Sequence, residues 1–198
     1  MSTRKWRLDS PHMRRLLDEA VARGMIIMTH VGDPDTWYRA KYADHAQYGT
    51  RDEHYAMWER VLQRFPEIPW IGAHMAGNPK NLVRLQSLLD RYPQLSIECS
   101  GTRWMPREPT LRRDEARYFF IRNADRIMWG SDQVSGDDRG FDFLASRWWV
   151  QRKLMETANI GPSPIFDPDL PDENQPTLRG LALPDEVLQK LFHDNAVK

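Results

Sequence analysis

The sequence lacks three features that would each assign it to a protein class at once. Only one of its 198 residues, Cys99, is a cysteine, so no internal disulfide can form and a reducing, cytoplasmic location is expected. No run approaches the roughly 20 apolar residues of a membrane span, and the first residues lack a signal-peptide core. Lys plus Arg equals Asp plus Glu at 28 each, which leaves no surplus positive charge. The composition therefore argues against disulfide-rich, membrane and general nucleic-acid-binding proteins.

The apolar pattern predicts helices that alternate with short buried strands. Hydrophobic residues make up 40% of the chain, enough for a core, and we expect a single domain over residues 1–198. The expected strands are residues 25–30, 70–74, 95–100 and 126–132. Helical spacing marks residues 11–21, 58–65, 82–89, 112–122, 141–155 and 184–192. Such alternation predicts an α/β fold of barrel type, with four parallel strands covered by helices.

Two segments show no clear periodicity. Residues 31–49 are polar and aromatic, and residues 160–180 contain several prolines. We expect a long loop after the first strand and a surface loop at about 160–180.

Three of the four expected strands end on a residue that can bind a metal ion. These residues are His30, His74 and Asp132. The carboxyl ends of parallel strands share one face, where active sites of α/β proteins lie. Two imidazoles and a carboxylate suit a divalent metal such as zinc and leave a position for a catalytic water. Each residue alone can instead be structural, and Asp132 can simply cap a turn.

Other residues near these strand ends are candidates for substrate binding. Arg103 follows the third strand, together with Trp104 and Arg107, and an arginine there can hold a substrate carboxylate or remain solvated. The loop after the first strand offers residues that either line a pocket or only pack beside it: Asp33, Trp37, Tyr38, Arg39 and Tyr42. Within the third strand, Cys99 is expected to be buried, and Glu98 needs a partner if it is buried too.

Five segments, in their order and spacing, resemble one enzyme family. They are residues 29–32 (THVG), 71–77 (IGAHMAG), 88–93 (LLDRYP), 126–132 (RIMWGSD) and 191–196 (LFHDNA). They resemble the amidohydrolase-related family, the branch of the amidohydrolase superfamily that includes aminocarboxymuconate-semialdehyde-type decarboxylases. The resemblance runs from about residue 11 to the C-terminus.

The resemblance implies a (β/α)₈ barrel and a metal-dependent hydrolase or decarboxylase that acts on a small carboxylated or cyclic compound. It assigns metal binding to His30, acid/base catalysis or a further metal contact to His74, and contact with the metal and its water to Asp132. In hydrolases of the family, a metal-bound hydroxide attacks a carbonyl. In the decarboxylases the metal binds the substrate, and protonation precedes loss of CO₂. Both reactions remain open, with Arg103 and Trp37 as expected substrate contacts.

The resemblance covers only the second half of the family barrel. The family's first strand carries a His-x-His metal pair, which occurs nowhere in this sequence, and 198 residues fall short of the usual length of about 250. An open half-barrel leaves strand edges and an inner face uncovered. We therefore expect a homo-oligomer or another association that covers them. The alternative function is a non-catalytic or truncated half-barrel that works only with a partner or a second copy.

Overall fold

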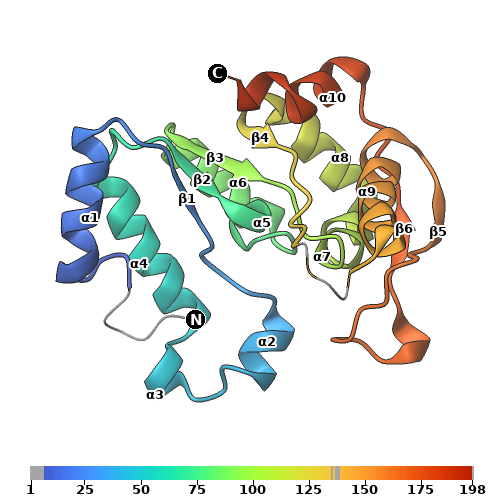
Figure 1. The fold of residues 1–198 in the computed structure, drawn as a ribbon, viewed down its shortest axis with the longest axis horizontal. Coiled ribbons are helices and arrows are strands. Elements are labelled where there is room, and N and C mark those ends of the chain that lie inside the picture. The colour runs from blue at the N-terminus through green and yellow to red at the C-terminus, as the bar shows by residue number, and fades with distance from the viewer. Residues whose placement is uncertain (1–6, 135, 137–138, 198) are drawn as a thin grey trace.

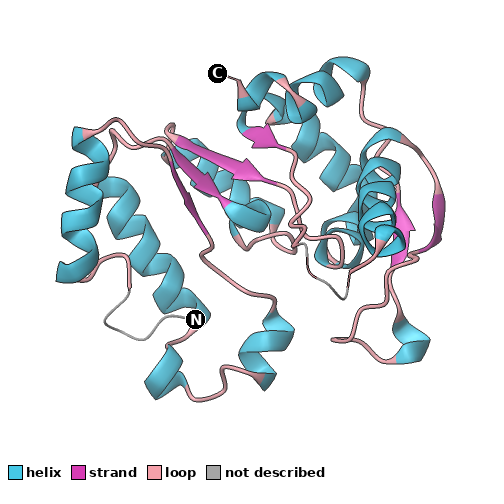
Figure 2. Cartoon of the chain, in the orientation of Figure 1, coloured by secondary structure: helices cyan, strands magenta, loops and turns pink. Residues whose placement is uncertain are grey.

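A four-stranded parallel sheet forms the centre of the protein (Figure 2). The computed structural model describes residues 7–134, 136 and 139–197. In spatial order, the strands are β1 (Ile27–Thr29), β2 (Trp70–Gly72), β3 (Leu95–Glu98) and β4 (Ile127–Met128). Every neighbouring pair is parallel. This confirms the predicted α/β class with four parallel strands.

Helices connect the strands and pack beside them (Figure 1). The longer helices are α1 (Pro11–Ala22), α4 (Arg51–Arg64), α6 (Leu82–Arg91), α8 (Arg113–Arg122), α9 (Phe141–Glu156) and α10 (Asp185–Phe192). Short elements are α2 (Asp35–Ala40), α3 (His45–Tyr48), α5 (Ala73–Ala76), α7 (Trp104–Arg107) and the 3-10 helices η2 (Pro109–Arg112), η3 (Ala124–Arg126), η4 (Asp172–Asn174) and η5 (Asp194–Ala196). Local signals set several boundaries: the Ser10 side chain caps α1, and a capping box of Thr50 and Glu53 begins α4.

Successive strand side chains point to opposite faces of the sheet, and the two faces are buried to different degrees. On the outer face, Trp70, Leu95 and Ile127 are fully buried in the core formed with the helices. On the inner face, Met28 is paired in register with Ile71. Met28 is 55% exposed and Ile71 is partly exposed, so among the described residues this face is less covered than the outer face.

The two segments expected to be loops contain regular structure, which corrects that prediction. Residues 31–49 include α2 and α3, and residues 160–180 contain an antiparallel pair, β5 (Ile160–Pro162) and β6 (Thr177–Arg179), with η4 between them. These elements span only three to six residues each, too few to show a period in the sequence. The second segment is also anchored in the interior, because Leu178 and Asp167 are fully buried.

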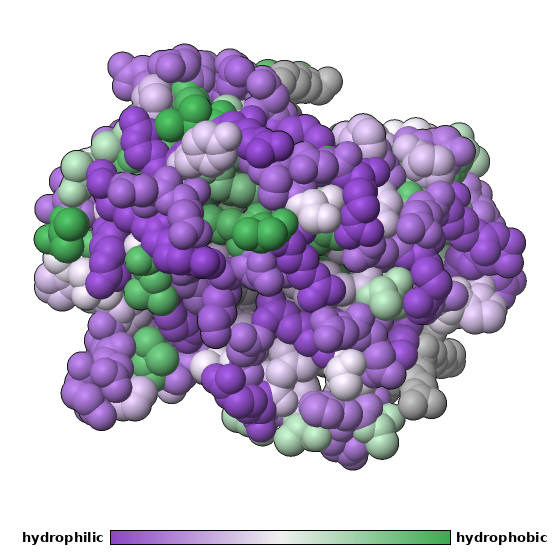
Figure 3. All heavy atoms as spheres, turned by 180° about the vertical axis from the view of Figure 1, so that it is seen from behind, coloured by the Kyte–Doolittle hydropathy of each residue, from purple (hydrophilic) through white to green (hydrophobic). Residues whose placement is uncertain are grey.

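The molecular surface is mainly hydrophilic. Figure 3 shows apolar side chains on one side of the molecule as separate small patches. In the part of the chain that the structure describes, no helix is both long and apolar enough to cross a bilayer.

Candidate functional site

The carboxyl ends of the four strands bring together the polar residues of the candidate site. His30 follows β1, His74 lies just after β2, Glu98 ends β3 and Asp132 follows β4. The His30 and His74 rings meet edge to face with centroids 4.9 Å apart, and the Trp104 ring lies 5.0 Å from that of His74. Two histidines separated by 44 residues in the sequence are thus neighbours, as the strand-end argument predicted.

His74 sits on a strained turn. α5 is not a right-handed helix, because His74, Met75 and Ala76 have φ values of 53°, 55° and 52°, followed by Gly77 at 63°. Left-handed backbone costs about 1–2 kcal/mol for each residue with a Cβ. Burial holds the turn in place: Met75 and Ala76 are fully buried, and a Cβ at Gly72 would lie only 2.7 Å from the Ala76 Cβ. Strain of this size that persists is typical of functional sites.

A buried carboxylate supports both the turn and the His74 ring. Glu98 Oε2 accepts a hydrogen bond from the His74 backbone N–H at 3.2 Å and another from the Ser100 hydroxyl at 2.7 Å. Ser100 Oγ in turn lies 2.7 Å from His74 Nδ1. The side chains of Glu98, Ser100 and His74, at the ends of β2 and β3, therefore form one hydrogen-bonded network.

Burial shifts the pKa values of the two ionisable groups in this network, Glu98 and His74. It raises the pKa of Glu98, although hydrogen bonds from Ser100 and His74 oppose the shift. It lowers the pKa of His74, against the opposing pull of the Asp132 charge and with the help of neighbouring His30. A neutral imidazole is thus favoured at position 74 near pH 7. A Cβ at Gly130 would overlap Glu98 Oε1, so the absence of a side chain there leaves space for the carboxylate.

The residue types at the site suit a metal ion, but too few of them lie close together. His30, with 44% of its side chain exposed, is available for coordination, and its Nε2 lies 3.6 Å from Asp33 Oδ1. Asp132, with φ of 49°, influences His74 through its charge. Among the described residues, however, no group of three or more His, Cys, Asp or Glu side chains is close enough to hold a metal ion.

A cavity opens next to His30. Its volume is about 480 Å³, and its lining includes Thr29, Asp33, Trp37 and Tyr42. Trp37 donates its indole N–H to Asp169 at 2.8 Å, and its ring lies 6.1 Å from that of Trp104. Trp37 therefore lines this cavity, which is one of the two placements expected for it from the sequence.

The two arginines after β3 have different environments. Arg103 is exposed and forms no ion pair with another described residue. Arg107 is buried and donates to Asp167 at 2.8 Å. Arg107 thus anchors the 160–180 segment, which leaves Arg103 as the arginine available to a ligand.

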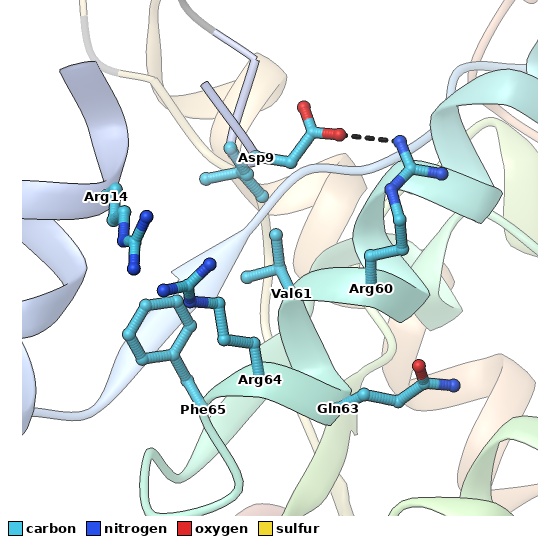
Figure 4. A pocket seen from close by; sticks show the side chains of 8 residues that line it. Asp9, Arg14, Arg60, Val61, Gln63, Arg64 and Phe65 are labelled. Carbon is cyan, nitrogen blue, oxygen red and sulfur yellow. Dashed lines mark hydrogen bonds and ion pairs between the residues drawn. The ribbon is translucent and has the colours of Figure 1, made fainter. Parts of the chain in front are cut away.

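A second hollow lies between α1 and α4, away from these histidines (Figure 4). Its volume is about 490 Å³, and exposed arginines such as Arg14 and Arg64 line it above Phe65. An ion pair of 2.5 Å joins Arg60 to Asp9 at its edge. It lacks the histidines and buried carboxylate of the strand-end site, so we regard it as a surface depression.

Sequence reasoning identified Glu98 as a residue that needs a partner but missed what the partner is. The missing residue is Ser100, two positions after Glu98 and just beyond the end of β3. That spacing, Glu-x-Ser at a strand end, was the available signal. The left-handed turn at His74 had no comparable signal, because only Gly77 in it is a glycine.

Comparison with solved structures shows the fold that the half-barrel resembles. An uncharacterized TIM-barrel protein from Bordetella bronchiseptica matches with a TM-score of 0.51 and 16% identity, over 96% of this chain and 50% of that chain. An amidohydrolase II protein matches at 0.49 and 15%, over 95% and 55%, and 5-carboxyvanillate decarboxylase from Sphingomonas paucimobilis at 0.42 and 15%, over 96% and 56%. The chain spans about half the length of these structures.

The family assignment comes from the sequence. A search of curated proteins found no significant match. A family model described as Amidohydrolase, by contrast, matches residues 2–198, almost the entire chain. The chain therefore belongs to the amidohydrolase family.

Proposed function

We propose that this chain supplies half of a metal-dependent active site that hydrolyses or decarboxylates a small carboxylated or cyclic compound. The observation that carries the proposal is the meeting of His30 and His74 at neighbouring strand ends, with ring centroids 4.9 Å apart and the charge of Asp132 acting on His74. Membership of the amidohydrolase family supports this class of chemistry.

In this proposal, His74 is the acid/base residue. Its pKa is lowered by burial, so the ring is ready to accept a proton near neutral pH. Asp132 then favours the protonated form through its negative charge. Arg103 would hold a substrate carboxylate with its exposed guanidinium, and Trp37 would contact the rest of the substrate in the cavity.

His30, His74 and Asp132 are the proposed ligands for a divalent metal, with zinc as the first candidate. Imidazole nitrogens and carboxylate oxygens both suit this ion. The described residues do not bring these three groups close enough to hold an ion as they stand, so binding of the ion would draw them together. Further ligands from a second half-barrel with a His-x-His strand would raise the affinity.

Elemental analysis and zinc titration of the purified chain test the proposal. We expect one divalent ion per site and a loss of affinity of at least roughly 10-fold in His30→Ala. The matched control is His45→Ala, because His45 is an exposed histidine on α3, outside the site. Absence of a stoichiometric divalent ion, with no effect of His30→Ala, would contradict the proposal.

The open edge of the sheet favours a second candidate function, a half-barrel that works by association alone. Among the described strands β1 pairs only with β2, and beside its free edge Ile26 and Met28 are 63% and 55% exposed. Light scattering should then show a dimer, or mixing with a separately expressed N-terminal half of a family barrel should restore metal binding. An active, metal-loaded monomer would rule out this candidate.

A further inference from the structure

Two glycines in the loops that carry the histidines meet at a single buried hydroxyl. Gly32 follows His30 by two positions. Gly77 follows His74 by three. A Cβ at Gly32 would lie 2.8 Å from the Tyr55 hydroxyl oxygen, and a Cβ at Gly77 would lie 2.7 Å from the same atom. The two backbones are also close, since the Cβ at Gly77 would lie 2.8 Å from the Gly32 carbonyl oxygen. The two histidine loops therefore contact each other at this hydroxyl.

The helix α4 holds one of these loops at two successive carbonyls. Tyr55 lies on α4 and is fully buried, and its hydroxyl donates to the Ala76 carbonyl at 3.0 Å. Arg51, one helical turn earlier, donates to the Gly77 carbonyl. Ala76 and Gly77 end the left-handed turn that begins at His74. Contacts from α4 therefore fix the end of this turn.

We infer that Tyr55 is a positioning residue for both histidines, and that its hydroxyl joins the His30 and His74 loops so that the two rings meet at the strand ends. The rings lie only two or three residues from the hydroxyl contact, and their centroids are 4.9 Å apart. Glycine at positions 32 and 77 leaves space for the hydroxyl oxygen, whereas a side chain at either position would overlap it.

This inference rests on the proposed function, because the spacing of the two histidines matters only if they act on the same ligand. A displacement of about 1 Å from the productive geometry can lower a reaction rate roughly 100-fold. Tyr55 is fully buried and does not line the cavity beside His30. It therefore acts through the two loops and not by contact with a substrate.

Tyr55→Phe tests the inference, because it removes the hydroxyl and keeps the ring in the core. Asn78 also donates to the Ala76 carbonyl, at 3.1 Å, so this carbonyl retains a partner and the variant should fold. Tyr92→Phe is the matched control. Tyr92 is also buried, but its hydroxyl bonds to side chains of α4 and not to a histidine loop.

NMR of the full chain, labelled with carbon-13 at histidine and treated with a chelator, reports the contact between the two rings. His30→Gln and His74→Gln identify their signals. We expect a nuclear Overhauser effect between the His30 and His74 ring protons in the unmodified chain and in Tyr92→Phe. In Tyr55→Phe this effect should weaken, and the ring signals of both histidines should shift together.

Gly32→Ala provides a second, independent measurement. Its Cβ would overlap the Tyr55 hydroxyl, so this variant should unfold at a lower temperature than the unmodified chain. Adding Tyr55→Phe removes the overlapping oxygen. The double variant should therefore lose less stability than the sum of the two single losses, as expected for residues in contact.

Three results would overturn the inference. The first is an unchanged ring contact with unchanged ring signals in a folded Tyr55→Phe variant. The second is the same change in Tyr92→Phe as in Tyr55→Phe, and the third is strictly additive losses for Gly32→Ala and Tyr55→Phe. These measurements need neither turnover nor bound metal. Their failure is therefore distinct from failure of the proposed function, which the zinc titration of His30→Ala reports.

Discussion

The two faces of the four-stranded sheet differ sharply, although the same strands form both. On the outer face, Leu95 and Ile127 are fully buried against helices, whereas on the inner face Met28 is 55% exposed. Two features that lower the folding stability lie at the carboxyl ends of the strands. They are the left-handed turn at His74 and the buried carboxylate of Glu98. Apolar burial on the outer face therefore supplies most of the folding stability. That stability offsets the cost of the strained, polar site at the strand ends.

The largest expected effect comes from truncating the outer face. Leu95→Ala should lower the free energy of unfolding by about 2–5 kcal/mol, because it leaves a cavity in a fully buried position. Met28→Ala, on the inner face, should change it by less than roughly 1 kcal/mol, since that side chain is more than half exposed. Urea denaturation of both variants measures the difference. Equal losses would mean that the inner face is packed in solution, for example against a second copy.

A smaller loss of stability is expected when a side chain is added inside the site. Gly130→Ala places a Cβ against Glu98 Oε1, and relief of this overlap should cost about 1–3 kcal/mol. The variant should also shift the His74 NMR signals, because Glu98 would move relative to Ser100 and the turn. Gly161→Ala is the control, since its nearest neighbour would be 3.8 Å away. Matching stabilities for the two variants would show that Glu98 is not held against Gly130.

The smallest effect on stability concerns Glu108, a largely buried carboxylate at the end of α7. Burial raises its pKa above the ordinary value of 4.5, and Arg107 offsets part of that shift. An acid whose pKa is raised by folding contributes stability that is fully present below about 4.5 and is lost as the pH rises through the folded pKa. Glu108→Gln should therefore gain stability relative to the unmodified chain as the pH rises across that window. Thermal unfolding at several pH values measures the difference, and a constant difference would place Glu108 in a water-like environment.

Much of the fold could be predicted because its signals are local. The Ser10-Pro11 pair began a helix as expected. Short apolar runs located three of the four parallel strands, whereas the third, β3, alternates apolar and polar residues. The same reasoning failed for residues 160–180. There one stabilising contact is the ion pair of Arg107 with Asp167, and those residues are 60 positions apart. A pairing over that distance leaves no periodic trace in the sequence.

The sequence by itself determined the order of helices and strands and the placement of His30, His74 and Asp132 at strand ends. It could do so because apolar periodicity selects the elements and parallel strands share one carboxyl edge. Only the tertiary structure decided how His74 is held, with its ring on Ser100 and its backbone N–H on Glu98, 24 residues away. Those contacts depend on the register between β2 and β3 and on the burial that sustains a left-handed turn, and both arise only when the sheet packs against its helices.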